Sequence, residues 1–153
     1  MIDEIVQGHF RLSEFLRSDT AVRQGLDNTP KAVDLANIRN VLAPGMQRVR
    51  DSLGRPVLIT SGYRSPEVNA AIGGSKSSQH SQGLAADFIC PAFGTPRQVV
   101  QYLMERSGEI RFDQLIFEGS WVHISFVAGA GRSQVLTAHF MRGGGVSYSP
   151  GLA

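Results

Sequence analysis

Residues 113–126 read DQLIFEGSWVHISF and contain two strand-like runs on either side of Gly119-Ser120. Glycine at the first central position is typical of a type II′ two-residue turn, so the segment predicts a β-hairpin. The turn sets three cross-strand pairs: Glu118 with Trp121, Phe117 with Val122, and Ile116 with His123. Side chains alternate between the faces of a strand, so one face is apolar and the other carries Glu118, Trp121, His123 and Ser125.

The polar face of this hairpin brings a carboxylate close to an imidazole. Glu118 and His123 are diagonal neighbours across the two strands, roughly 7–8 Å apart at the backbone. An edge hairpin with a solvated polar face produces the same pattern, so the hairpin alone leaves both interpretations open.

A second polar segment, residues 78–87, reads SQHSQGLAAD. His80 lies in a predicted polar loop, and Asp87 lies in an otherwise apolar strand predicted over residues 84–90. A charged aspartate in a dry interior needs a cation, a set of backbone amides or a metal ion as its partner. Two alternatives remain open here: an ion pair between Asp87 and Arg64, and a His80 side chain that is merely exposed to solvent.

The two segments together offer two histidines, one aspartate and a nearby glutamate. A catalytic zinc site uses three protein ligands and leaves the fourth position for water, and neutral imidazole and carboxylate suit zinc. The combination therefore predicts a zinc site formed by His80, Asp87 and His123. Glu118 is placed to take a proton from the water as it attacks a carbonyl.

The other histidines and the cysteine do not fit this site. Cys90 has the opposite strand parity to Asp87, so we expect it to fill the core as a small hydrophobic residue. His9 and His139 lack matching partners in the sequence and are predicted to be structural or exposed. A single cysteine also excludes an intrachain disulfide and any site built from several thiolates.

A third segment, SGYRSP at residues 61–66, lies at a predicted strand-to-helix junction. Arg64 offers a planar group suited to a carboxylate or a polarised carbonyl. A surface salt bridge is an equally good interpretation of this arginine when it is considered alone.

The composition is that of one folded domain. The chain has 153 residues, 42% of them hydrophobic, and its formal net charge is only +2. This charge is too small to indicate a nucleic-acid partner, and no apolar run approaches the roughly 18 residues of a membrane span. The first residues do not show the basic and then apolar pattern of a signal peptide.

Helical patterns come first along the chain and strand patterns follow, which predicts an α+β fold with helices packed on one face of an antiparallel sheet. Short helical turns are predicted over residues 13–23, and a longer helix with Thr29 as its N-cap extends to residue 53, kinked or split at Pro44-Gly45. Further helices are predicted after Ser65 and Thr95. We expect a domain over residues 1–141 and a flexible, glycine- and serine-rich tail over residues 142–153.

The three quoted segments resemble the zinc D-Ala-D-Ala carboxypeptidase-like metallopeptidases of bacterial cell-wall metabolism. Residues 78–87 match that family's SxHxxGxAxD pattern, and residues 113–126 match its ExxWxH pattern. The opening residues 10–30 also resemble the start of this domain in phage and prophage proteins. The resemblance covers about residues 10–135 and implies the Hedgehog/DD-peptidase fold.

Residue by residue, the resemblance implies one zinc ion held by His80, Asp87 and His123. It places Glu118 at the catalytic acid/base position, five residues before the last ligand. Some relatives carry this carboxylate three residues before the ligand, where this chain has Ser120.

The resemblance also assigns the substrate contacts. Arg64 matches the arginine that binds substrate and helps to polarise the scissile carbonyl. Ser78 and Trp121 are expected to contact substrate beside the metal.

The implied function is hydrolysis of peptide bonds in the stem peptides of bacterial peptidoglycan, by a carboxypeptidase or an endopeptidase. Two other functions fit the same residues: a catalytically inactive zinc module that binds cell wall, and a structural module of a virion. We expect a monomer that acts on the bacterial cell wall, delivered by a phage or released from the cytoplasm through a holin.

Overall fold

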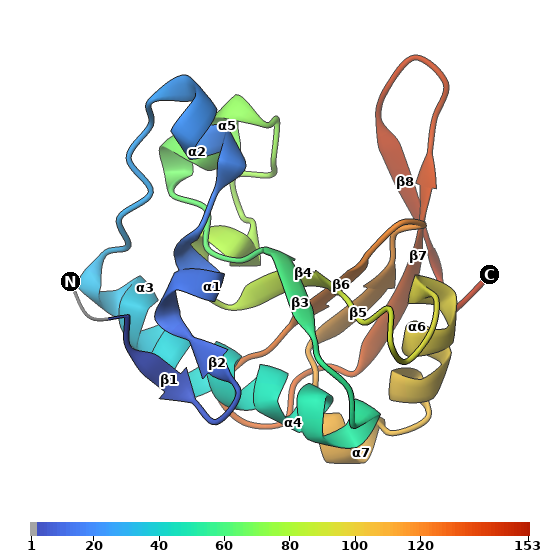
Figure 1. The fold of residues 1–153 in the computed structure, drawn as a ribbon. Coiled ribbons are helices and arrows are strands. Elements are labelled where there is room, and N and C mark those ends of the chain that lie inside the picture. Colours follow the sequence, from blue (N-terminus) through green and yellow to red (C-terminus); the bar gives the residue numbers. More distant parts are fainter. Residues whose placement is uncertain (1–2) are drawn as a thin grey trace.

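The computed structural model describes residues 3–153, and a six-stranded sheet forms its centre (Figure 1). The strands are β3 (Leu58–Ser61), β4 (Ala85–Ile89), β5 (Gln114–Phe117), β6 (Val122–Ser125), β7 (Gln134–Phe140) and β8 (Val146–Pro150). Their spatial order is β3-β4-β6-β5-β7-β8. The predicted α+β class is confirmed.

The sheet is mixed, because β5 and β7 run parallel while the other neighbouring strands are antiparallel. The loop after β6 explains this difference from the expected antiparallel sheet. In that loop the Ser133 and Gln134 N–H groups donate to the carbonyls of Phe112 and Asp113. The chain is thereby returned to the starting end of β5, and β7 must run in the same direction.

Helices and a small hairpin surround the sheet. The helices are α1 (Leu12–Leu16), α2 (Asp19–Gln24), α3 (Ala32–Asn37), α4 (Ala43–Leu53), α5 (Pro66–Ala71), α6 (Pro96–Met104) and α7 (Ser107–Ile110), together with a π-helical turn (Ile38–Leu42) and a 3₁₀ turn (Gln79–Gln82). Strands β1 (Ile5–Gln7) and β2 (Phe10–Arg11) form a separate pair. Over residues 3–153, none of the helices combines the length and apolar character that crossing a membrane requires.

The long helix differs from the prediction at its start. Thr29 does not cap it, since the Thr29 hydroxyl donates to Asp27 and Lys31 occupies the N-cap position. The chain stays helical through Pro44, but a π-helical turn at Ile38–Leu42 precedes the proline. Proline has no N–H and crowds the carbonyl four residues back, and the wider turn accommodates both effects.

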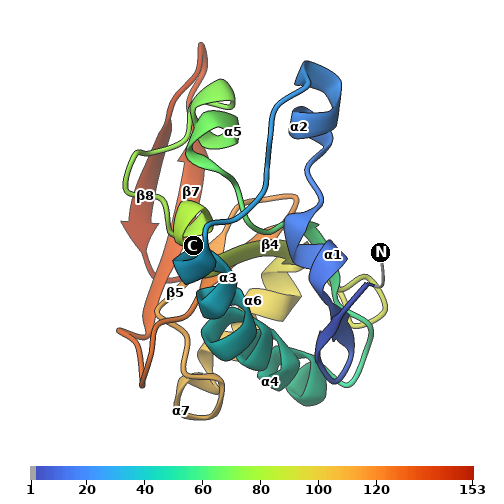
Figure 2. The same ribbon diagram turned by 90° about the vertical axis from the view of Figure 1, so that its left-hand side faces the viewer.

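One face of the sheet forms the core with helices α4 and α6, which lie on the same side of it (Figure 2). The apolar hairpin residues Leu115, Val122, Ile124 and Phe126 are all buried there, as the alternation predicts. Cys90 is buried in the same core, and its Sγ contacts the carbonyl oxygen of Pro56. The opposite face of the hairpin is thereby left for the polar side chains.

The C-terminal residues, expected to form a tail over 142–153, include a strand that the sequence analysis did not predict. Strand β8 pairs antiparallel with β7 from Leu136↔Pro150 to Phe140↔Val146, and the two strands project from the body as a hairpin (Figure 1). Gly143, Gly144 and Gly145 all have positive φ and form the turn. The prediction missed β8 because the glycines obscure the alternation of apolar and polar residues in Val-Ser-Tyr-Ser.

Candidate metal centre

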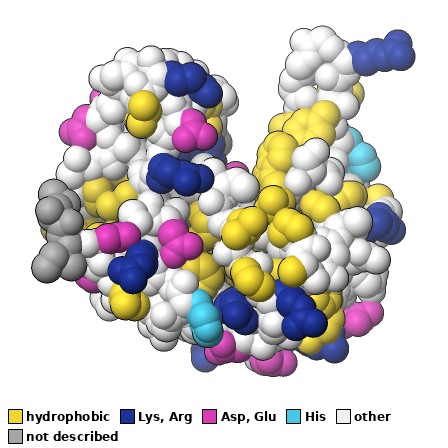
Figure 3. All heavy atoms as spheres, viewed as in Figure 1, with side chains coloured by type: hydrophobic (Ala, Val, Ile, Leu, Met, Phe, Trp, Pro, Cys, Tyr) yellow, Lys and Arg dark blue, Asp and Glu magenta, His cyan; other side chains and the backbone are white. Residues whose placement is uncertain are grey.

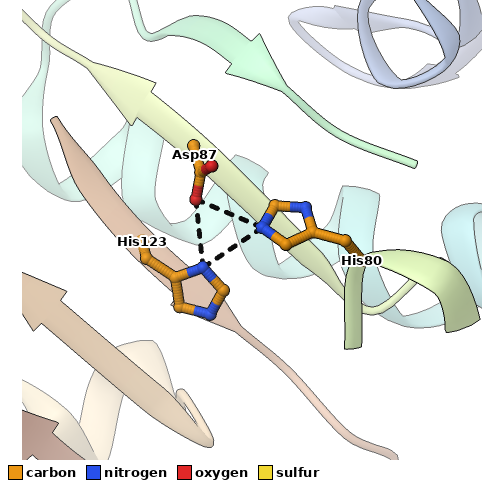
Figure 4. A group of neighbouring side chains, drawn as sticks. All are labelled: His80, Asp87 and His123. Atoms are coloured by element: carbon orange, nitrogen blue, oxygen red, sulfur yellow. Dashed lines mark hydrogen bonds and ion pairs between the residues drawn. The ribbon is translucent and has the colours of Figure 1, made fainter. Parts of the chain in front are cut away.

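The three predicted ligands meet on the polar face of the sheet (Figure 4). Asp87 on β4 lies directly opposite His123 on β6 in the antiparallel register. His80 comes from the 3₁₀ turn, which begins where Ser78 Oγ accepts a hydrogen bond from the His80 backbone N–H. Two ligands are therefore placed by strand pairing and the third by a capped turn.

The three ligand atoms form a small triangle. His123 Nδ1 lies 3.0 Å from Asp87 Oδ1, and His80 Nε2 lies 3.2 Å from each of these two atoms. Bonds of about 2.0–2.1 Å at tetrahedral angles place zinc ligand atoms roughly 3.3 Å apart. The triangle therefore fits a tetrahedral zinc ion with a fourth position free for water.

The hydrogen bonding of His80 also points to a cation. Its Nδ1 lies 2.8 Å from the Gly62 carbonyl oxygen, which can only accept, so the ring proton is on Nδ1. Nε2 of the neutral ring then carries only a lone pair, yet it faces Asp87 Oδ1, a second acceptor, at 3.2 Å. A metal ion satisfies both atoms, and the bond to Gly62 is the outer contact that commonly orients a metal-binding histidine.

Burial and charge favour the protonation states in which these side chains bind a metal ion. Burial lowers the pKa of His80, which keeps the imidazole neutral. Burial alone would raise the pKa of Asp87, but its close contacts with the His123 and His80 rings outweigh burial and hold this pKa well below its usual value. Neutral imidazole and ionised carboxylate are the forms that bind metal.

Glu118 lies on the same face, at the end of β5. The hairpin has the predicted register, with Ile116 opposite His123 and the Glu118 N–H donating to the Trp121 carbonyl. Burial and the nearby Asp87 carboxylate raise the pKa of Glu118, against smaller opposing effects of His123, Trp121 and Arg64. A raised carboxyl pKa suits a group that accepts and returns a proton near neutral pH.

Arg64 and Trp121 place buried donors beside the predicted metal ligands. Arg64 Nε and Trp121 Nε1 are both buried without a partner in hydrogen-bonding geometry. Arg64 makes no ion pair with Asp87 within residues 3–153, so the alternative of a buried Asp87–Arg64 pair does not hold. Buried donors without partners are uncommon, and here they are available to a ligand in the cleft.

These side chains line one cleft of about 770 Å³, which also contains Ser78. Figure 3 shows the molecule hollowed between the part that holds α2 and α5 and the projecting β7–β8 hairpin. A cavity of about 850 Å³ lies elsewhere, between α1 and β3, and contains none of the metal ligands. The chemistry of the described residues therefore favours the first cleft.

Sequence reasoning missed the residues that hold the Arg64 loop in place. The Asn28 amide donates to the Tyr63 carbonyl and accepts from the Ser65 N–H. The Tyr63 hydroxyl donates to the buried Asp34, and burial together with this carboxylate raises the pKa of Tyr63 to about 12. Nothing local in the sequence links Asn28 to residue 63.

A second supporting group lies beside His80. Asp113 is buried and accepts hydrogen bonds from the Gln79 amide and from the Arg132 guanidinium. The Arg132 guanidinium and these hydrogen bonds hold the pKa of Asp113 below its usual value. Asp113 thereby connects Gln79, which directly precedes His80, to Arg132 in the loop between β6 and β7.

Gly62 connects the site to the N-terminal segment and yields a first prediction. A Cβ at this position would lie 2.5 Å from the Phe15 carbonyl oxygen, while the Gly62 carbonyl holds His80. We expect Gly62→Ala to destabilise the fold by about 1–3 kcal/mol, roughly 2–12 °C in melting temperature, and to weaken zinc binding about 10- to 100-fold. Calorimetry and zinc titration measure the two effects.

Gly108→Ala is the matched control for this substitution. No atom lies within 4 Å of a Cβ at Gly108, which is in helix α7, so this variant should bind zinc normally and melt no lower than the wild type. Unchanged zinc affinity in Gly62→Ala would show that the Gly62 carbonyl does not orient His80.

The other histidines lie outside the cluster. His9 is exposed and its Nδ1 contacts the Gln47 amide. His139 is exposed on β7, where its Nε2 contacts the Ser149 hydroxyl.

Comparison with known proteins agrees with this geometry. No curated protein matches the chain at a significant level. The Peptidase M15 family model matches residues 8–125, which include all three predicted ligands, Glu118 and Arg64. This match spans most of the chain and supports a metallopeptidase. The chain therefore belongs to the Peptidase M15 family.

Proposed function

We propose that the protein is a zinc-dependent peptidase that hydrolyses peptide bonds in the stem peptides of bacterial peptidoglycan. The observation that carries the proposal is the presence of Glu118, with its raised carboxyl pKa, in the same cleft as the ligand triangle. The family match supports the hydrolase class and a substrate of the cell wall.

Each side chain has a distinct role in this proposal. When bound, zinc polarises the scissile carbonyl and lowers the pKa of its water. Glu118 takes the proton of the attacking water and returns it to the leaving amine. Arg64 donates its unused N–H groups to the substrate carbonyl, where negative charge develops as the water attacks.

Ser78 and Trp121 bind the substrate in this proposal. Both line the cleft beside the ligands. The Trp121 ring also lies 6.0 Å from the Phe140 ring of β7. Trp121 thus presents a flat apolar surface to the peptide.

A zinc-containing module that binds cell wall without cleaving it is the second candidate function. Such a module needs the ligand triangle, but it has no need of a carboxylate with a raised pKa beside it. Glu118 and the unpaired Arg64 donor therefore favour the enzyme.

Digestion of defined muropeptides, followed by mass spectrometry, tests the proposal. We expect hydrolysis by the zinc-loaded protein, loss of hydrolysis with a chelator, and recovery when zinc is returned. Release of a terminal residue identifies a carboxypeptidase, and separation of cross-linked peptides identifies an endopeptidase. Zinc-dependent binding without any cleavage would instead support the binding module.

A further inference from the structure

The face of the sheet that carries the metal site continues to its far edge at β8. His123 pairs with Ile116, Ile116 with Leu136, and Leu136 with Pro150, which forms one row across four strands. Phe117, the last residue of β5, pairs with Thr137 on β7. Glu118 directly follows Phe117, and Ala138 directly follows Thr137, so these two residues lie in the next row. Ala138 pairs with Tyr148, so Tyr148 lies in the row of Glu118.

Ala138, between these two positions, has only a methyl group. This residue is 9% exposed, whereas Tyr148 is 49% exposed. Tyr148 lines the cleft together with Glu118 and the three ligands. Because the Ala138 side chain is small, the phenol ring of Tyr148 has space to face the metal site.

The Tyr148 hydroxyl is a free donor in this cleft. It makes no hydrogen bond within the part of the chain that the structure describes, although other tyrosine hydroxyls do, such as those of Tyr63 and Tyr102. Burial and the carboxylates of Glu118 and Asp87 raise the pKa of Tyr148, so the phenol keeps its proton. A ligand in the cleft would find a hydrogen-bond donor there.

The β7–β8 hairpin lies outside the part of the chain that the family model describes. The match ends at Ser125, and β7 begins at Gln134. Hydrophobic side chains gather on the side of the hairpin that faces the hollow (Figure 3). Leu136 and Val146 of the hairpin line the cleft as Tyr148 does. The hairpin therefore supplies one wall of the cleft.

We propose that Tyr148 is a substrate-binding residue that helps to set specificity, with its hydroxyl donating to a carbonyl or carboxylate oxygen of the bound peptide and its ring packing on the peptide side chains. This inference rests on the proposed peptidase function. Strands lie about 4.8 Å apart, so the backbone of Tyr148 is roughly 10 Å from that of Glu118. Tyr148 therefore contacts the part of the peptide that flanks the scissile bond.

Kinetics of two Tyr148 variants on a defined muropeptide test this role. Contacts made equally in the ground and transition states raise KM and leave kcat unchanged. We expect Tyr148→Phe to raise KM about 3- to 10-fold, as for the loss of one hydrogen bond. Tyr148→Ala should raise KM about 10- to 100-fold, because it also loses the packing of the ring. In both variants kcat should stay within about twofold of the wild type.

Ser147→Ala is the matched control, since Ser147 is next to Tyr148 on β8 and has the opposite strand parity. This control should keep the wild-type KM, and all three variants should keep bound zinc and the wild-type melting temperature. A wild-type KM in Tyr148→Ala would overturn the inference. A raised KM accompanied by lost zinc would overturn it as well, because the effect would then be structural.

A binding measurement tests the role of Tyr148 separately from the proposed peptidase activity. If the wild type cleaves no muropeptide, the peptidase proposal fails, and fluorescence of Trp121, the single tryptophan, then measures binding. A Kd raised about 10-fold or more in Tyr148→Ala would still support the role of Tyr148. An unchanged Kd, or no binding by the wild type, would overturn it.

Discussion

Replacing Glu118 with alanine should abolish hydrolysis while the metal stays bound. A positioned acid/base group contributes about 10²- to 10⁴-fold to a rate, and the fall in kcat should be of this size. The triangle of His80, Asp87 and His123 does not include Glu118, so the zinc content should remain that of the wild type. Steady-state kinetics on a muropeptide and elemental analysis of the purified variant measure the two quantities.

Two further variants sharpen this experiment. Glu118→Gln keeps the shape of the side chain but cannot accept the proton, so it should be as inactive as the alanine variant. Glu67 is exposed on α5, outside the cleft, and Glu67→Ala should keep full activity. Full activity in Glu118→Ala would exclude the acid/base role, and loss of zinc would identify Glu118 as a ligand instead.

Replacing His123 with alanine should remove both the metal and the activity. Loss of one of three ligands leaves His80 and Asp87, and we expect zinc affinity to fall by more than the 10- to 100-fold typical of outer contacts. Zinc at about 100 times its Kd stabilises a protein by about 2.7 kcal/mol. Added zinc should therefore raise the melting temperature of the wild type and leave that of His123→Ala unchanged.

His139→Ala is the matched control, because His139 is an exposed histidine of the same sheet that contacts Ser149. It should bind zinc and hydrolyse substrate as the wild type does. A zinc-dependent increase in the melting temperature of His123→Ala would show that the metal binds elsewhere.

The hairpin could be predicted because its signals are local. Gly119 fixes the turn, the turn fixes the register, and strand parity then sends His123 to one face and Val122 to the other. The parity of β4 placed Cys90 in the core in the same way. These arguments need only a few residues of chain, and the structure agrees with them.

Other features depend on contacts between distant segments, and the sequence pattern could not indicate them. The parallel pairing of β5 with β7 follows from hydrogen bonds between Phe112 and the loop before β7. Only this pairing brings Tyr148 into the row of Glu118. The contact of Asn28 with Tyr63 likewise joins residues 35 apart in the chain.

Thr29 and Pro44 show that local signals for the start and end of a helix can be changed by contacts elsewhere in the fold. At each position the surrounding contacts change the structure that the local signal predicts. The Thr29 hydroxyl binds Asp27 rather than capping the helix. The helix around Pro44 continues through a π-helical turn, with buried Ile38 and Leu42 at its ends. Packing of the helix in the core outweighs the local preference to end it.

The pairing of Asp87 with His123 has a consequence for when the protein becomes active. A shift of one residue between β4 and β6 would turn His123 to the apolar face, so backbone pairing and core packing align these two ligands without any help from an ion. Small zinc-finger domains, in contrast, are unfolded until zinc binds. This chain is expected to fold and persist in a metal-free, dormant form. The local supply of zinc, rather than the time of synthesis, would then decide when hydrolysis begins.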